Sequence, residues 1–259
     1  MGTTKSTKRG SCPTVLVTGG SGEIGSAICQ KFAQNGYTVI ATYQSNHTKA
    51  EKLLEILGEG NHRIFQAATT DSQALIDLHN FVVEHYGRLD VLVNNAGITI
   101  PVPHEDLDGL TDEWIDKIMQ TNWRGSFAMI RKMKNLLIQT AKHKHQSALV
   151  VNISSIAGIF GIGSNVAYCA SKAALDSMTR SLARALSPEI RVCSVSPGFV
   201  EGEYTKNFDV AFLENQRINT PLGRFATSDD VANAVYALTD TLTFSTGNII
   251  TVDGGRLLK

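Results

Sequence analysis

Short apolar runs recur along the chain and alternate with longer segments whose apolar residues are spaced three or four positions apart. The short runs centre on residues 15–17, 39–41, 64–65, 91–93, 149–151, 192–195 and 249–250. They lack the apolar–polar alternation of half-exposed strands, which favours strands buried on both faces. Helical spacing appears in Ile24, Ile28 and Phe32, in Leu75, Leu78, Val82 and Val83, and in Leu175, Met178, Leu182 and Leu186. The alternation predicts an α/β fold in which helices cover both faces of a mostly parallel, seven-stranded sheet, a three-layer α/β/α sandwich.

No linker rich in proline or serine interrupts this alternation. Pro101 and Pro103 fall in one loop after the fourth predicted strand. Residues 13–259 are therefore expected to form a single domain. Residues 1–12 mix charged and small polar side chains without apolar periodicity, which is typical of a flexible, solvated leader.

The composition narrows the class of protein. The chain has 259 residues, and its 24 Lys and Arg balance its 24 Asp and Glu. This balance argues against a disordered chain or a basic nucleic-acid-binding protein. The sequence contains neither an apolar run long enough to span a membrane nor a signal peptide, so we expect a cytoplasmic protein without membrane or nucleic-acid partners. The four cysteines lie far apart and are expected to be reduced thiols, and the seven histidines are dispersed, so no metal site is expected.

A basic run, Lys142-His143-Lys144-His145, stands apart from this balanced background. We interpret it as the end of a helix, where the helix dipole favours cations.

A glycine-rich turn follows the first predicted strand. Residues 18–25 read TGGSGEIG, and helical spacing starts at once. Glycine permits positive φ and close approach of the backbone, so such a turn can bring amide groups and a helix N-terminus to a pyrophosphate. A tight strand-to-helix turn without a ligand is the plainer alternative. The position of the turn in a strand–helix–strand series favours dinucleotide binding.

The end of the second strand indicates which dinucleotide is bound. An acidic residue there would bond the ribose hydroxyls of NAD and repel a 2′-phosphate. Residues 42–49 read TYQSNHTK and contain no Asp or Glu, while Lys49 and His47 carry or can carry positive charge. The stretch favours NADP(H), with NAD(H) as the alternative. A purely structural role, capping the next helix, also remains open.

Three residue types suited to proton transfer follow the fifth strand. Ser155 stands at the strand end, Tyr168 follows 13 positions later, and Lys172 comes four after that. In a helix, Tyr168 and Lys172 share one face. A free phenol has a pKa of about 10, and an adjacent ammonium favours the phenolate, which brings the phenol closer to working pH. Ser155, at the carboxyl edge of the sheet, can bond a substrate oxygen.

Together these motifs resemble the classical short-chain dehydrogenases/reductases over Thr14 to Gly255. The resemblance also covers motifs read from the sequence as NNAG (94–97), TN (121–122), SPG (196–198), PLGRF (221–225) and VDGG (252–255). It implies a Rossmann-like single-domain fold. The chain looks most similar to 3-oxoacyl carrier protein reductases and acetoacetyl-CoA reductases.

The resemblance implies an oxidoreductase that transfers hydride between a nicotinamide and a carbonyl or secondary alcohol. Its catalytic set would be Asn122, Ser155, Tyr168 and Lys172. Tyr168 would protonate the developing alkoxide, and Ser155 would position and polarise that oxygen. Lys172 would lower the pKa of the phenol and hold the nicotinamide ribose. The main chain at Asn122 would anchor a water that restores the proton through Lys172.

The same resemblance implies a set of cofactor-binding residues. Asn95 is expected to stabilise the sheet where the cofactor crosses it. The full set is Gly19, Ser21, Gly22, Glu23, Ile24, Tyr43, Gln44, Ser45, Ala68, Thr69, Asn95, Ala96, Gly97, Tyr168, Lys172, Pro197, Gly198 and Val200.

Three positions depart from the family pattern, all on the cofactor side. Glu23 stands where the turn usually has its middle glycine, and its carboxylate would repel a pyrophosphate unless it points away. Ala68 replaces a common Asp and cannot bond the adenine amino group, a loss of about 0.5–1.5 kcal/mol. Gly202 replaces a threonine that often contacts the carboxamide. These departures leave open a cofactor-impaired nucleotide-sensing or scaffold protein of the same fold.

Substrate and assembly are inferred less directly. Residues 199–220 are expected to form a lid, since long loops at this edge of a sheet commonly close active sites. Its apolar residues, Phe199, Tyr204, Phe208, Phe212 and Leu213, suit an acyl chain or pack the lid onto the body. Trp123 is expected to be core or interface. The resemblance implies a carbonyl or acyl-thioester substrate and a homotetramer that pairs residues 122–142 and 166–186 across subunits.

Overall fold

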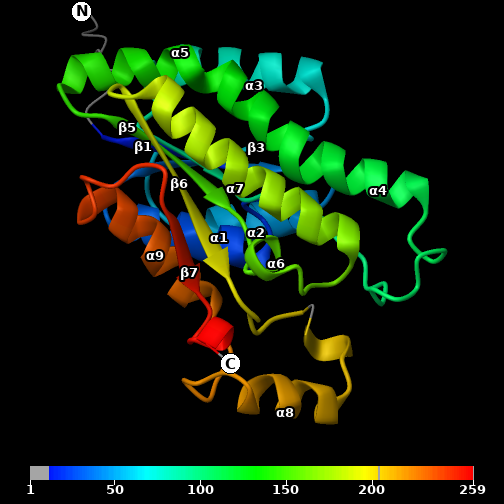
Figure 1. The fold of residues 1–259 in the computed structure, drawn as a ribbon. Helices are drawn as coiled ribbons and strands as arrows, with labels where there is room; N and C mark the ends of the chain where they lie inside the picture. Colours follow the sequence, from blue (N-terminus) through cyan, green and yellow to red (C-terminus); the bar gives the residue numbers. More distant parts are fainter. Residues whose placement is uncertain (1–11, 204, 259) are drawn as a thin grey trace, which may run out of the picture.

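The computed structural model describes residues 12–203 and 205–258, and these form a three-layer α/β/α sandwich (Figure 1). The middle layer is one seven-stranded sheet in which every pair of neighbouring strands is parallel. Its strands are β1 (Thr14–Val17), β2 (Thr38–Tyr43), β3 (Arg63–Gln66), β4 (Val91–Asn94), β5 (Ala148–Ile153), β6 (Ile190–Pro197) and β7 (Ile249–Val252).

The order of the strands determines where a ligand can bind. Across the sheet the order is β3-β2-β1-β4-β5-β6-β7, so the chain moves outward in one direction from β1 and then in the other from β4. Loops leaving β1 and β4 therefore diverge to opposite faces and open a crevice at the carboxyl ends of these strands. In open α/β sheets this switch point is the usual ligand site.

Helices cover both faces of the sheet (Figure 1). On one face, α3 (Ser72–His85), α5 (Ser126–Lys144) and α7 (Val166–Leu186) bury one apolar cluster. On the other, α1 (Glu23–Gln34), α2 (His47–Leu57) and α9 (Ser228–Asp240) bury a second. Helix α4 (Asp112–Met119) leads into α5. Two short helices, α6 (Ala157–Phe160) and α8 (Val210–Ile218), lie beyond the carboxyl ends of the strands.

The sequence predictions of the fold are confirmed. All seven predicted apolar runs lie in strands, and each of the three quoted helical patterns lies in a helix. Strands β1, β2, β4, β5 and β6 are buried throughout, whereas the edge strands β3 and β7 are partly exposed because each has only one neighbour. The basic run does end α5, with His145 as the residue that caps it.

Some predictions fall outside the part of the chain that the structure describes. The predicted leader is one of these, since residues 1–11 are not described, and Tyr204 is another. Among the described residues, Cys29, Cys169 and Cys193 are buried free thiols and Cys12 is an exposed one. No helix in the described ranges has the length and apolar character needed to cross a bilayer.

Candidate active site

The glycine-rich turn is shaped by close backbone contacts. Gly19 has φ of +62°, a conformation that side chains disfavour. A Cβ at Gly25 would overlap the Gly19 carbonyl oxygen and lie 2.8 Å from the Asn95 amide nitrogen. Both glycines are therefore required by the turn itself. The turn delivers the chain directly into α1, which begins at Glu23.

The N-terminus of α1 is open to a ligand. Gly22 precedes it and has no side chain to cap the first amide groups of the helix. Uncapped amides together with the helix dipole favour a phosphate at this position. The open end faces a cleft of about 390 Å³. The cleft begins at the glycine turn and extends along the carboxyl ends of β1 and β4, and its bare backbone fits the pyrophosphate of a dinucleotide.

Most of the predicted cofactor residues line this cleft. They are Gly19, Ser21, Gly22, Glu23, Ile24, Tyr43, Gln44, Ala68, Thr69, Asn95, Ala96 and Gly97. Ser45, Tyr168, Lys172, Pro197, Gly198 and Val200 are not among its lining residues. The cleft also includes four residues that the prediction omitted, Gly25, Ala67, Ile98 and Thr121. Gly25 and Thr121 belong to motifs that the sequence analysis had quoted, so only the assignment was missed.

Thr18 and Asn95 hold the two sides of the crevice together. The Thr18 hydroxyl accepts the amides of Asn95 and Ala96, each at 3.0 Å. In return, the Asn95 side chain donates to the carbonyls of Thr18 (3.0 Å) and Gly19 (3.1 Å). These bonds join the loops after β1 and β4 directly under the cleft. The predicted stabilising position of Asn95 therefore has a physical basis.

The end of β2 combines capping with open polar groups. Asn46 caps α2 by accepting the Lys49 amide at 2.9 Å, so the structural alternative holds for this residue. Tyr43 bonds His47 at 2.7 Å, and His47 lies 3.2 Å from Glu51. The side chains of Gln44, Ser45 and Lys49 are exposed at this rim.

Asn122 lies in a π-helical turn, Gln120–Gly125, between α4 and α5. Such turns are rare and frequently occur at functional sites. The Asn122 side chain accepts the Ile98 amide (2.8 Å) and donates to the Ile98 carbonyl (3.0 Å) and the Ser171 hydroxyl (3.0 Å). The main-chain carbonyl of Asn122 accepts the Ser126 hydroxyl at 2.9 Å. Asn122 thereby links the loop after β4 to α7.

Tyr168 and Lys172 stand in the first two turns of α7. Asn165 caps this helix by accepting the Tyr168 amide at 2.7 Å. Lys172 lies with its ammonium 5.6 Å from the centre of the Tyr168 ring and donates to the Ile153 carbonyl at 2.8 Å. A Cβ at Gly97 would lie 3.6 Å from that ammonium. The predicted pair is therefore adjacent and borders the loop that also lines the cleft.

Ser155 lies between β5 and α6, and α6 packs against α7. The Ser155 hydroxyl accepts the Ala157 amide at 3.1 Å, at the end of β5. In the next turn, a Cβ at Gly158 would lie 2.6 Å from the main-chain carbon of Lys172. Only glycine permits this backbone-to-backbone contact. It holds the serine loop against the helix that carries Tyr168 and Lys172.

Burial makes Lys172 an unusual lysine. Only 5% of it is exposed, and desolvation lowers its pKa from 10.5 to about 8, although the nearby Asp176 opposes this shift. Asp176 lies one helical turn further along α7 and is also buried. Burial raises its pKa, against the opposing effects of Ser154, Ser194, Arg180 and Lys172. Neither of its carboxylate oxygens has a hydrogen-bond partner within the described ranges.

A buried polar network reaches Asp176 through Ser194. Asn94 donates to Asn152 at 2.9 Å, Asn152 donates to Thr179 at 2.8 Å, and Thr179 contacts Ser194 at 2.8 Å. The network crosses from β4 through β5 to α7 and β6. Sequence reasoning missed it, because each residue read alone is an ordinary polar position in a strand or helix.

The three departures from the family pattern lie at or beside the cleft. Ala68 presents a methyl group to it. The Glu23 carboxylate reaches the main chain of the predicted lid, accepting the Glu203 amide at 2.8 Å. Gly202 lies directly beside that carboxylate.

The predicted lid is a turn and a short 3-10 helix followed by α8 (Figure 1). Helix α8 has no buried residue among those described. The aromatic residues of the lid pack on one another. Phe199 lies 5.9 Å from Phe208, 6.1 Å from Phe212 and 5.2 Å from Phe225, measured between ring centres. Phe199, Phe208 and Phe212 therefore pack together in the present conformation, and Phe199 also contacts Phe225, which follows the lid. Trp123 packs on the core and stacks on Phe127, as expected.

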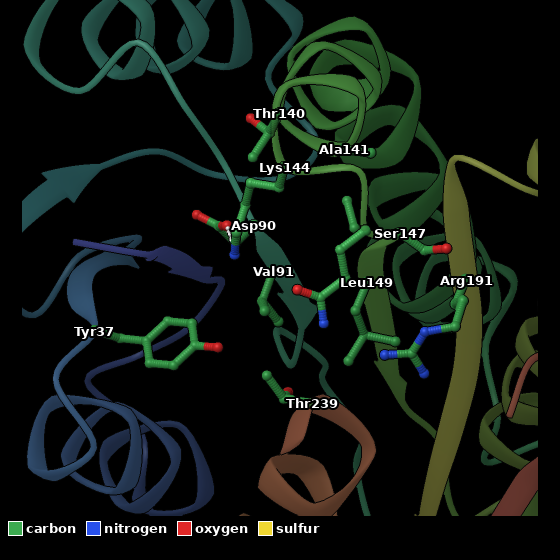
Figure 2. Close-up of a pocket in the computed structure, with 12 residues that line it drawn as sticks. Tyr37, Asp90, Val91, Thr140, Ala141, Lys144, Ser147, Leu149, Arg191 and Thr239 are labelled. Atoms are coloured by element: carbon green, nitrogen blue, oxygen red, sulfur yellow. Dashed lines mark hydrogen bonds and ion pairs between the residues drawn. The ribbon is translucent and has the colours of Figure 1, made fainter. Parts of the chain in front are cut away.

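A second cavity, of about 40 Å³, lies at the opposite, amino edge of the sheet (Figure 2). Asp90 borders it and accepts hydrogen bonds from Arg88 (2.7 Å), Lys144 (2.9 Å) and the Thr14 amide (2.8 Å). Burial raises the pKa of Asp90, but these bonds outweigh it and hold the pKa below its usual value. The acid is fully engaged in joining α5 to β1, so this cavity has a structural role. Among the described residues, no three potential ligands cluster to hold a metal ion.

Comparisons with known proteins agree with this geometry. A family model described as enoyl-(acyl carrier protein) reductase matches residues 20–256. The chain is 37% identical, over 95% of its length and 96% of the relative's, to a Streptomyces violaceoruber protein named as ketoacyl reductase 2 of the granaticin polyketide synthase. It is 34% identical to 3-oxoacyl-(acyl carrier protein) reductase FabG of Thermotoga maritima, covering 94% of this chain and 97% of that one. A solved structure from Burkholderia xenovorans, titled a short-chain dehydrogenase/reductase, superposes with a TM-score of 0.90 at 31% identity and covers 97% of this chain and 100% of that one.

Proposed function

Because this chain belongs to the short-chain dehydrogenase/reductase family of nicotinamide-dependent oxidoreductases, we propose that it is an NADP(H)-dependent reductase of 3-oxoacyl thioesters or related ketones. The observation that carries the proposal is the placement of Tyr168 beside the buried ammonium of Lys172, next to a loop that lines an open cleft of about 390 Å³. The names of the ketoacyl reductase relatives support the substrate class.

The residues of the cleft are suited to holding the cofactor. The α1 N-terminus and the glycine turn would bind the pyrophosphate, and the acid-free rim after β2 would accept a 2′-phosphate. Ala68 and Thr69 would border the adenine, and Gly97 and Lys172 the nicotinamide ribose. Pro197, Gly198 and Val200 would close the carboxamide end. A bound nicotinamide would supply the hydride for the carbonyl carbon.

Tyr168 is the proposed general acid. Its hydroxyl donates a proton to the substrate oxygen, which the Ser155 hydroxyl holds and polarises. The Lys172 ammonium favours the resulting phenolate electrostatically, and its hydrogen bond to the Ile153 carbonyl fixes its position. The main-chain carbonyl of Asn122 would anchor the water that returns the proton through Lys172.

The protein is further proposed to act as a homotetramer, in which α5 and α7 pair with their copies across subunits, and as a cytoplasmic enzyme. Support for the tetramer comes from the family resemblance. Sedimentation velocity of the purified protein tests this proposal by measuring how many copies of the chain assemble.

The experiment that tests the proposed function is the variant Tyr168→Phe. We expect it to bind NADPH nearly as well as the native protein and to lose turnover of a 3-oxoacyl thioester by about 10²–10⁴-fold. Tyr236→Phe is the matched control, because Tyr236 packs on Phe32 on the α1–α9 face. Comparable activity in the Tyr168→Phe and native proteins would refute the assignment. A native protein that binds NADPH without consuming it with thioesters, diketones or quinones would be a nucleotide sensor or scaffold.

A further inference from the structure

Two of the departures from the family pattern meet in space. Glu23 opens α1 beneath the cleft, and Gly202 lies in the predicted lid, far along the chain. One Glu23 oxygen accepts the Glu203 amide at 2.8 Å. A Cβ at Gly202 would overlap the other oxygen and lie 2.7 Å from the carboxylate carbon. The Glu23 carboxylate therefore occupies the volume that any side chain at position 202 would need.

Hydrogen bonds fix the lid backbone at this contact. The Gly202 carbonyl accepts the Thr205 hydroxyl at 2.7 Å, and Thr205 is buried. One residue earlier, the Glu201 amide donates to Ala226 at 2.9 Å. Room for a side chain at 202 can therefore be made most easily by moving the Glu23 carboxylate, which is the end of a flexible side chain. A displaced carboxylate lies at the N-terminus of α1, where the cleft begins.

Charge adds a second consequence. Glu23 is one of the residues that line the cleft, so the position of its negative charge affects any anion bound at the glycine turn. In the present conformation the Glu23 carboxylate accepts a hydrogen bond from the lid. Lys206, which forms an ion pair with Glu203, also interacts electrostatically with Glu23. The contact thus keeps the carboxylate occupied and joins the lid to the floor of the cleft.

We propose that Glu23 and Gly202 are a matched pair of positioning residues. Because position 202 has no side chain, the Glu23 carboxylate fits against the lid there. This contact fastens the lid over the cleft and keeps the negative charge of Glu23 away from the phosphate site. The part of this proposal that concerns phosphate rests on the proposed function. The fastening of the lid does not depend on it. The two apparent defects in the cofactor motif are then a single compensated change.

The test is a mutant cycle with two separate readouts. Native protein, Glu23→Ala, Gly202→Thr and the double variant are compared by hydrogen exchange of the Glu203 amide without cofactor, and by the dissociation constant for NADPH. We expect the amide to exchange faster in all three variants, because each lacks the contact. We expect NADPH affinity to fall about tenfold in Gly202→Thr and to recover in the double variant, because only Gly202→Thr drives the charge back over the cleft.

Two controls sharpen the cycle. Glu23→Gln keeps an oxygen acceptor without the charge and should retain most of the Glu203 protection. Replacing the exposed Glu201 by Ala in the Gly202→Thr background should rescue nothing. Equal losses of NADPH affinity with and without the Glu23 carboxylate would overturn the charge argument, and unchanged Glu203 exchange in Glu23→Ala would overturn the lid contact. A native protein that does not bind NADPH would refute the proposed function, while the exchange data would still decide whether the lid is fastened.

Discussion

Asp176 gives the sharpest test of how the site sets the charge of Lys172. Burial lowers the pKa of Lys172 from 10.5 to about 8, a difference of roughly 3 kcal/mol at about 1.4 kcal/mol for each pH unit. The Asp176 carboxylate works against this shift. The change Asp176→Asn keeps the size of the side chain and removes its charge, so the pKa of Lys172 should fall further.

The expected size of the effect follows from how close the Lys172 pKa of about 8 lies to neutral pH. A further drop of about one unit would leave about half of the Lys172 side chains neutral at pH 7. Since the proposed reduction requires the ammonium, the alkaline limb of kcat/KM should move from near pH 8 to near pH 7. The assay is NADPH oxidation by a 3-oxoacyl thioester across roughly pH 6 to 10, with bell-shaped profiles fitted for each protein.

The pH dependence of stability gives an independent measure of the charge on Lys172. The folded-state pKa of Lys172 lies below its unfolded value, so the unfolded chain binds more protons between about pH 8 and 10.5, and this lysine makes the protein more stable as pH rises through that window. In Asp176→Asn the rise should begin at lower pH. The control is Asp77→Asn, the same chemical change on the exposed face of α3. A kinetic limb that stays in place in Asp176→Asn would show that Asp176 does not set the charge of Lys172.

Two further outcomes are expected. The rim after β2 carries no acidic residue, which predicts a higher kcat/KM with NADPH than with NADH. One charge-assisted contact to the 2′-phosphate gives a preference of at least about tenfold. Steady-state rates that favour NADH would overturn this prediction. At the amino edge, Asp90→Asn should lower the free energy of unfolding by about 1.5–3 kcal/mol in urea titrations, because Arg88 and Lys144 lose a charged acceptor. The folded-state pKa of Asp90 is depressed, so its contribution to stability is present above its unfolded pKa and is lost as pH falls through the folded value. A difference in unfolding free energy between native protein and Asp90→Asn that persists unchanged in acid would contradict that role.

The sequence was informative wherever one segment determined its own structure. Apolar runs located all seven strands, since a parallel strand covered on both faces must be apolar throughout. The glycine turn and the four-residue spacing of Tyr168 and Lys172 are likewise local patterns, and most of the predicted cofactor residues line the cleft. Assignments of this kind depend on neighbours within a few positions.

Features built from distant segments could not be predicted in this way. The contact of Glu23 with the lid joins residues 180 positions apart, so each looked like a separate defect. The environment of Asp176 depends on Ser154, which follows β5, and on Ser194, which lies in β6. The π-helical turn at Asn122 has no signature in the local spacing of apolar residues, because its shape is tied to Ile98 and Ser171 by hydrogen bonds.

The contact of Gly158 with the backbone of Lys172 has a consequence for how such a protein can diverge. Main chain against main chain sets the separation of the serine loop from the helix, and no side chain takes part. Immediately afterwards, Ile159, Phe160 and Ile162 are exposed. Substitutions at those exposed residues can therefore leave the separation of the serine loop from α7 unchanged, because that separation depends on Gly158 and on none of them.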